Sequence, residues 1–229
     1  MDHAPGRPRW TAGLDRLAVL LFGVLWTTAL LRFAPSLLSS GLGWPALLGA
    51  MCGYLLADFL SGSVHWLADR YFTPTTWLIG PLLIAPFREH HVDASEITRH
   101  DFFEVSGNNA LVTLPAVALL LTLPLPDPTG GASIPGVIGL GLGTTAALLL
   151  TNQLHRWAHT EHPPRPIARL QRWGWILSPE RHARHHAGGH DRAYCVTSGW
   201  LNPLLDGTGF FSSLEALIES FCPRRRGVS

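Results

Sequence analysis

The sequence predicts an all-α integral membrane protein with about four transmembrane helices and a cytoplasmic, histidine-rich helical cap. Charged residues make up 14% of the 229-residue chain, against about 25% in soluble proteins, and the mean hydropathy is positive. Eleven of the twelve histidines fall in four clusters just outside hydrophobic stretches. These features predict a single membrane domain over residues 1–229, with its polar chemistry at the bilayer surface.

Four stretches are apolar enough to cross a bilayer, whose roughly 30 Å core takes about 20 residues per helix. After a tail of residues 1–16, the predicted spans are residues 17–38, 44–63, 110–125 and 135–154. The first span lacks the small-residue cleavage pattern of a signal peptide. The third span is short and contains Pro115, so the sequence leaves open whether it crosses, begins earlier near Val105, or re-enters.

The arginines predict the topology, because basic residues concentrate on the cytoplasmic side. Most of them lie before the first span, between the second and third, and after the fourth: Arg7, Arg9 and Arg16; Arg70, Arg88 and Arg99; and Arg156 onward. The connections at residues 34–43 and 126–134 hold none. The tail and the regions 64–109 and 155–229 are therefore expected in the cytoplasm, and with them every histidine cluster. No basic residue is lysine, which is typical of GC-rich bacteria and favours a bacterial inner membrane.

Two further stretches qualify this arrangement. Residues 77–87 are apolar but too short and proline-broken to cross, so we expect an interfacial segment lying on the bilayer. The glycine run at residues 136–143 lies within the fourth span and permits close approach of another helix. It is no phosphate loop, because it lacks the lysine.

The histidine spacings predict faces that converge on metal. Residues three, four, seven or eight apart share a helix face, as in the stripes His155, His159, His162 and His182, His185, His186, His190. His65 shares a face with Asp58 and Asp69, at the end of the second span. Either carboxylate is expected to accept the second ring proton of a ligating histidine. His162, before Pro163, is the weakest candidate, and His190, beyond two glycines, is uncertain from spacing alone.

The side chains available as ligands limit which metal ions the site can bind. The three cysteines are far apart, so thiolate ligation and a disulfide framework are not expected. The Glu-x-x-His pattern of carboxylate di-iron bundles does not occur. Imidazole suits zinc, copper, iron and nickel, and nine or ten histidines exceed the needs of one ion but match two. A pair of irons fits this count best, while a metal transporter and a haem protein remain rival hypotheses.

Several longer strings of residues resemble the plasmanylethanolamine desaturase family. They are Phe87-Arg-Glu-His-His91, Ile97-Thr-Arg-His-Asp101-Phe, Thr151-Asn-Gln-Leu-His155-Arg-Trp-Ala-His159-Thr, Arg181-His-Ala-Arg-His-His186, and Thr197-Ser-Gly-Trp-Leu-Asn202. The resemblance runs from about Asp58 to Asp206, with the clusters in family order. The family includes bacterial and animal plasmalogen-forming enzymes and a plant plastid branch acting on phosphatidylglycerol.

The resemblance implies an oxygen-dependent di-iron desaturase that forms the vinyl-ether double bond of plasmalogens from 1-O-alkyl ethanolamine phospholipids. The alternatives are a fatty-acyl phospholipid desaturase or a hydroxylase using the same site. Its implied metal ligands are His65, His90, His91, His100, His155, His159, His182, His185, His186 and His190. An apolar groove between the second and fourth spans is expected to hold the lipid.

The partners follow from the same chemistry. Two electrons are needed from outside, and the chain has no Rossmann glycine fingerprint and no iron–sulfur cysteine pattern. A separate donor, a cytochrome b-type protein or a ferredoxin, is therefore expected. The arginines at 165, 169, 172, 181, 184 and 192 are a candidate docking surface, and attraction to anionic lipid explains them equally well. The net charge of +1 argues against a nucleic-acid partner.

Overall fold

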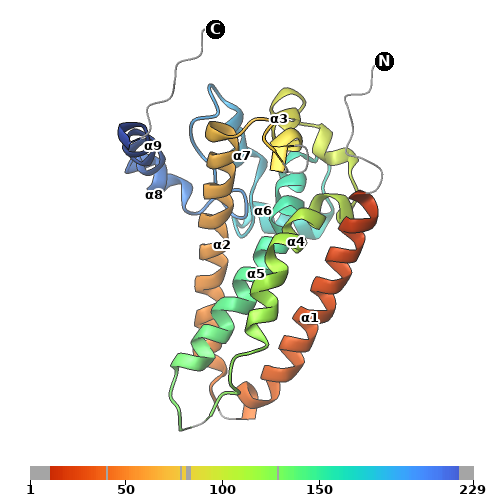
Figure 1. Cartoon of the computed structure of the whole chain (residues 1–229), viewed down its shortest axis with the longest axis vertical. Helices are drawn as coiled ribbons and strands as arrows, with labels where there is room; N and C mark the ends of the chain where they lie inside the picture. The colour runs from red at the N-terminus through yellow and green to blue at the C-terminus, as the bar shows by residue number, and fades with distance from the viewer. Residues whose placement is uncertain (1–10, 40, 78, 81–83, 128, 222–229) are drawn as a thin grey trace.

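The computed structural model describes residues 11–221 except 40, 78, 81–83 and 128, and the regular secondary structure of this part of the chain consists of helices (Figure 1). Residues 1–10 of the predicted tail and Cys222 lie outside the described residues. The elements in chain order are α1 Thr11–Ser39, α2 Gly43–Tyr71, α3 Ala85–Val92, the 3-10 helix η2 Glu96–Arg99, α4 Phe102–Leu120, α5 Ser133–His159, α6 Arg165–Arg172, α7 Pro179–His186, α8 Asn202–Gly207 and α9 Phe210–Phe221.

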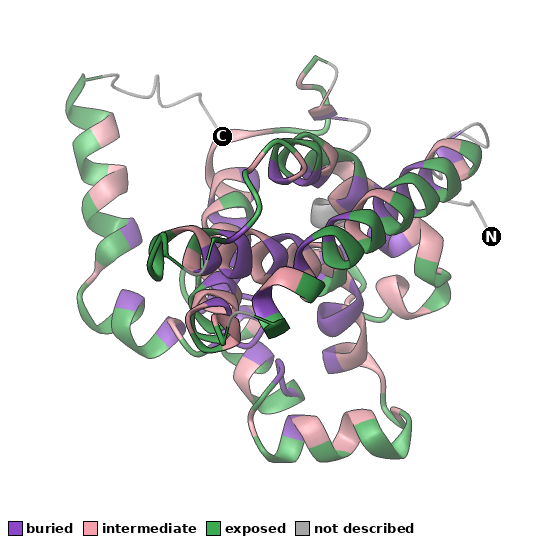
Figure 2. Cartoon of the chain, turned by 90° about the horizontal axis from the view of Figure 1, so that it is seen from below, coloured by how far each residue is buried: buried purple, intermediate pink, exposed green. Residues whose placement is uncertain are grey.

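Four of these helices, α1, α2, α4 and α5, are long and apolar enough to cross a membrane. Their outer faces expose large apolar side chains, including Leu17, Leu31, Val112 and Leu119. In Figure 2 the buried residues of the long helices face one another, while exposed residues face outward. Water would not cover such a surface favourably, whereas lipid would. The prediction of an all-α membrane protein with four spans is confirmed.

The four helices lie side by side in the order α2, α5, α4, α1 (Figure 1). The helices α2 and α5 run parallel, and both end near the short helices α3, α6 and α7. The helices α1 and α4 run the opposite way. Phe33 and Ile138 are fully buried in the apolar core. As predicted, the histidine clusters therefore share one end of the bundle.

Glycines bring α2 and α5 into backbone contact. A Cβ atom on Gly139 or Gly143 of α5 would collide with the backbone of Ala46 or Ala50 in α2. From the opposite helix, a Cβ atom on Gly53 would lie 2.7 Å from the Thr144 nitrogen. This confirms the close approach predicted from the glycine run. It contradicts the expected groove between these spans along their lower part, because there is no room between the backbones for a lipid chain.

The third span begins and ends earlier than the predicted 110–125. Asp101 caps α4 by accepting a hydrogen bond from the Glu104 amide at 2.9 Å, and the Glu104 carboxylate accepts one from the Asp101 amide, also at 2.9 Å. This capping box starts the helix eight residues before Ala110. Pro124 disfavours helix at the preceding residue, which explains the end near Leu120. At 19 residues, or about 28 Å, the helix is long enough to cross.

The predicted interfacial segment 77–87 falls partly on residues that are not described. Within it, Trp77 is 87% exposed.

Candidate metal centre

Four helices supply the histidines of the site. His65 and Asp69 lie one turn apart on α2, and His155 and His159 lie one turn apart on α5. The short helix α3 contributes His90 and His91. The helix α7 contributes His182, His185 and His186, and its first turn is fixed by the Ser178 hydroxyl, which accepts a hydrogen bond from the Arg181 amide at 3.3 Å. Side chains separated by 120 residues of sequence thus meet at one end of the bundle.

One group consists of five histidines whose coordinating atoms lie within 4.8 Å of one another: His90, His155, His159, His182 and His186. We call this the five-histidine group. Within it, the Nε2 atom of His182 lies 2.7 Å from that of His155 and 3.0 Å from that of His186. The Nε2 atom of His186 in turn lies 3.1 Å from that of His90. Four Nε2 atoms thus converge on one place.

The second group, which we call the mixed group, combines His65, Asp69, His91 and His185 within the same 4.8 Å limit. The Asp69 carboxylate lies 3.4 Å from His65 Nε2, 3.7 Å from His91 Nδ1 and 3.6 Å from His185 Nε2. The sequence predicted Asp69 as a residue that orients a ligand. Its position also qualifies it as a ligand itself.

Burial keeps these imidazoles neutral. Desolvation, together with the smaller effects of His159, His186 and other neighbouring histidines, lowers the pKa of His90 to about 2. The pKa of His185 falls to about 4, mainly by desolvation. Desolvation likewise holds the pKa of His182 well below its ordinary value. A neutral imidazole offers the lone pair that a metal ion needs.

The arrangement fits metal ions. A metal–imidazole bond of about 2.1 Å separates neighbouring ligand nitrogens by roughly 3.0 Å at right angles, close to the 2.7–3.1 Å between the Nε2 atoms of the five-histidine group. Neutral rings cannot satisfy one another at such a convergence, because each has only one N–H to donate. In the five-histidine group as described, the buried His159 Nε2 has no hydrogen-bond partner. An unsatisfied buried nitrogen of this kind indicates a ligand.

Two backbone carbonyls orient histidines of the mixed group, and the sequence analysis missed both. His65 Nδ1 lies 3.1 Å from the Tyr194 carbonyl oxygen, and His185 Nδ1 lies 2.8 Å from that of Arg192. A carbonyl can only accept, so each Nδ1 carries the proton and each Nε2 keeps its lone pair. Residue type could not reveal this role, because every residue has a carbonyl.

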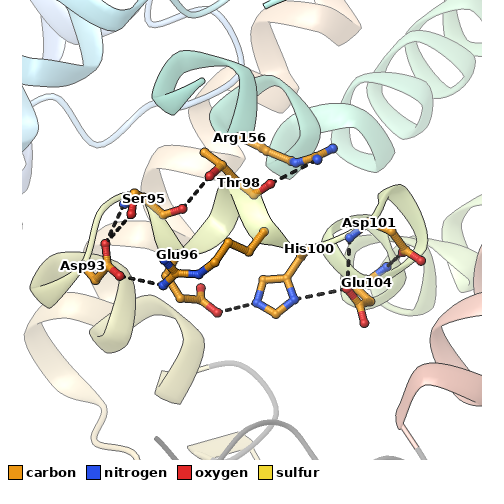
Figure 3. A network of polar contacts seen from close by, with 9 residues as sticks. Asp93, Ser95, Glu96, Thr98, His100, Asp101, Glu104 and Arg156 are labelled. Atoms are coloured by element: carbon orange, nitrogen blue, oxygen red, sulfur yellow. Dashed lines mark hydrogen bonds and ion pairs between the residues drawn. The ribbon is translucent and has the colours of Figure 1, made fainter. Parts of the chain in front are cut away.

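Two predicted ligands lie outside both groups. The His100 ring lies between two carboxylates, with Nε2 on Glu96 and Nδ1 3.2 Å from Glu104 (Figure 3). The same network ties η2 to α5 through Arg156, which donates to the Thr98 carbonyl at 3.2 Å. The spacing of four residues on each side of His100 was the available signal. The His190 ring stacks on that of His91, with the centroids 4.0 Å apart, so it borders the mixed group.

Asp58 has other partners than the predicted imidazole. Its fully buried carboxylate accepts hydrogen bonds from the amides of Ser198 at 2.7 Å, Gly199 at 3.0 Å and Leu201 at 3.2 Å. The interaction organises a loop instead of a ligand, because three amides turn toward the carboxylate where the chain folds back against α2. The side chain of His162, the weakest candidate, is 91% exposed, and its Nε2 lies 3.8 Å from the Glu161 carboxylate. Cys52 and Cys195 form no disulfide.

Comparison with known proteins places these residues in a family context. Residues 54–226 match the family described as the lipid desaturase domain. The chain is 42% identical over 175 residues to plasmanylethanolamine desaturase of Myxococcus xanthus, covering 76% of this chain and 61% of that protein. It is 40% identical over 175 residues to plasmanylethanolamine desaturase 1 of Mus musculus, covering 76% and 65%.

A plant relative is less similar. The chloroplastic fatty acid desaturase 4 of Arabidopsis thaliana is 34% identical over 174 residues, covering 75% of this chain and 50% of that protein. The chain therefore spans less than two thirds of the length of these three relatives. No solved structure matches it.

Proposed function

The chain belongs to the lipid desaturase family, and we propose that it is an oxygen-dependent di-iron desaturase that forms the vinyl-ether double bond of plasmalogens. Its substrate is a 1-O-alkyl ethanolamine phospholipid, and the two hydrogens leave the first two carbons of the alkyl chain. The observation that carries this proposal is the pair of histidine groups within the family region. The 42% and 40% identities to plasmanylethanolamine desaturases favour the ether substrate over the acyl one, at 34%.

Each of the two groups would hold one metal ion. The five-histidine group offers imidazole alone, and the mixed group offers three imidazoles and the Asp69 carboxylate. Imidazole-rich sites suit iron among other ions. When bound, iron supplies the oxidising power that removes hydrogen from an unactivated C–H bond. The predicted ligands His100 and His190 are assigned here to positions beside the ions, because neither belongs to a group.

The chain's own contribution is to orient the ligands and exclude water. His65 and His185 are completely buried, and Tyr194 packs its ring 5.4 Å from that of His185. Leu177 and Val196 form a small buried cluster with Ala158 near the five-histidine group. Such apolar walls keep water from the reacting carbons.

We also propose that the histidine-bearing end faces the cytoplasm of a bacterial inner membrane. Arg70 and Arg156 lie in the last turns of α2 and α5, and Arg99 lies in η2, whereas the connections at residues 34–43 and 126–134 lack basic residues. An external electron donor, a cytochrome b-type protein or a ferredoxin, would dock at the histidine-bearing end. Of the candidate arginines, Arg181 is engaged internally, because its Nη1 donates to the carbonyls of Gly174 at 2.9 Å and Ser198 at 3.0 Å. The docking surface therefore rests on the others.

The test is expression in a bacterium without plasmalogens that is supplied with a 1-O-alkyl phospholipid. We expect a product two mass units lighter that mild acid cleaves to a fatty aldehyde, because a vinyl ether hydrolyses readily. His155→Ala should abolish the product, whereas His162→Ala, on an exposed ring, should not. Loss of two mass units from acid-stable acyl chains would support the acyl desaturase instead. A gain of sixteen units would identify a hydroxylase.

A further inference from the structure

The segment between α7 and α8 contacts the mixed group through backbone carbonyls as well as through the rings of His190 and Tyr194. Residues 190–195 run past both His65 and His185, and the carbonyls of Tyr194 and Arg192 accept their Nδ1 protons. These two carbonyls belong to the residues on either side of Ala193. The position of this short segment thus determines how two of the four residues in the mixed group are turned.

The segment has an unusual backbone. His190 has a φ of 53° and Ala193 a φ of 56°, and both lie in the left-handed region that side chains with a Cβ atom rarely adopt. Such a conformation costs free energy and persists only where surrounding contacts impose it. Ala193 lies directly between Arg192 and Tyr194. Its left-handed conformation therefore helps to set the direction of both carbonyls.

The helix α8 provides the contacts that impose this conformation. Asp206 Oδ1 accepts a hydrogen bond from the Ala193 amide at 3.2 Å. Asn202 holds Cys195 from both sides, because its Oδ1 accepts from the Cys195 amide at 2.8 Å and its Nδ2 donates to the Cys195 carbonyl at 3.0 Å. Four residues apart, Asn202 and Asp206 lie on one face of α8.

We propose that Asp206 and Asn202 are positioning residues for the metal ion of the mixed group. They hold residues 193–195 in place, and the carbonyls of Arg192 and Tyr194 then fix His185 and His65 with each Nε2 available to metal. Hydrogen bonds of this kind to ligand histidines typically change metal affinity about 10- to 100-fold. The inference rests on the proposed function, because it presumes two ions.

The proposal makes a selective prediction. Residues 192–194 accept ring protons from the mixed group, and none of the hydrogen bonds described for the five-histidine group ends on them. Weakening the segment should therefore release one ion and leave the other. Truncation of Asp206 is sterically mild, because its side chain lines a cavity of about 240 Å³ together with Asp191 and Arg192. A general loss of structure would instead release both ions.

The experiment is iron counting on purified chain reconstituted with iron(II), by mass spectrometry, before and after competition with a chelator. Asp206→Ala removes the acceptor for the Ala193 amide, and Asp206→Asn retains an acceptor oxygen. The matched control is Asp127→Ala, because Asp127 accepts hydrogen bonds within its own exposed loop, from the Thr129 amide and hydroxyl, both at 2.8 Å. Circular dichroism and the thermal midpoint establish that each variant is folded.

After competition with the chelator, we expect about two irons for the wild type, Asp206→Asn and Asp127→Ala, and about one for Asp206→Ala. In Asp206→Ala the second iron should be lost at a chelator concentration 10- to 100-fold lower than in the wild type. Two firmly held irons in Asp206→Ala would overturn the proposal, and so would loss of both irons from a folded chain. If Asp206→Ala does not fold, Asn202→Asp decides, because it keeps the acceptor and loses the donor to Cys195. Unchanged iron retention there would overturn the proposal. A wild-type chain without iron would contradict the proposed function itself.

Discussion

Adding one methyl group at Gly139 should destabilise the whole bundle. The new Cβ atom of Gly139→Ala would lie 2.6 Å from the carbonyl carbon of Ala46 and 2.8 Å from its Cα, and closer still to the carbonyl oxygen. The shortest ordinary contact for a Cβ atom is 3.4 Å, so the helices must separate by about 0.8 Å to relieve the contact with the carbonyl carbon, and by more to relieve the contact with the oxygen. The obstacle is backbone on a rigid helix, which has no rotamer to change.

Overpacking of this kind typically costs about 1–3 kcal/mol. For a chain of roughly this size, each kcal/mol shifts the thermal midpoint by about 2–4 °C, so Gly139→Ala should lower it by roughly 2–12 °C. The iron content measured well below the midpoint should not change, because Gly139 lies sixteen residues, or about 24 Å of helix, before His155.

The control is Gly23→Ala, also within a membrane-spanning helix, where an added Cβ atom meets nothing within 4 Å. Alanine favours helix over glycine by about 1 kcal/mol, so this variant should be as stable as the wild type or more so. Thermal unfolding in detergent, followed by circular dichroism, compares the three proteins. Equal midpoints for Gly139→Ala and Gly23→Ala would refute the backbone contact between α2 and α5.

Three shorter predictions concern the site and its surroundings. Substitution of the buried His155 by alanine should reduce bound iron by at least one ion per chain, whereas His162→Ala should retain the wild-type count, and equal counts would remove His155 from the site. Asp58→Asn should lower stability by about 1–3 kcal/mol, seen as a lower thermal midpoint, because the new amide N–H groups face backbone donors. Acid should destabilise the metal-free protein. His185 has a folded pKa of about 4, below its unfolded value of about 6.5, so only the unfolded chain binds the proton in this window. Stability is therefore present above pH 6.5 and falls as the pH drops toward 4, and a midpoint constant from pH 7 to 5 would contradict this.

The sequence was most informative where a simple period or composition carries the information. Apolar runs predicted four spans, and arginine placement predicted that the histidine clusters share one end of the bundle. Spacing along α5 and α7 predicted faces that the structure brings together, so that eight of the ten predicted histidines lie in the two groups. Each of these features depends on local helix geometry, which sequence spacing describes well.

What the sequence could not predict depends on contacts between distant segments. Nothing in the spacing around Asp58 reveals that residues 198–201 fold back to present three amides to it. His100 is a histidine like the members of the two groups, yet its ring contacts the carboxylates of Glu96 and Glu104, four residues away on either side. The glycine run predicted close packing against another helix, but the sequence did not show that this helix is α2. The lipid groove was therefore expected between the two helices that are in backbone contact.

The backbone contact between α2 and α5 has a consequence for how the substrate's tail is accommodated. An enzyme that acts in the middle of an acyl chain must enclose many methylene groups to measure the distance to the reacting bond. Here Gly139, Gly143 and their partners on α2 leave no tunnel between these helices, and the proposed reaction needs only the first two carbons of the chain at the metals. The remaining methylene groups then stay among the bilayer lipids that surround the bundle. Selection by tail length should accordingly be weak, and the enzyme would recognise its substrate near the glycerol backbone.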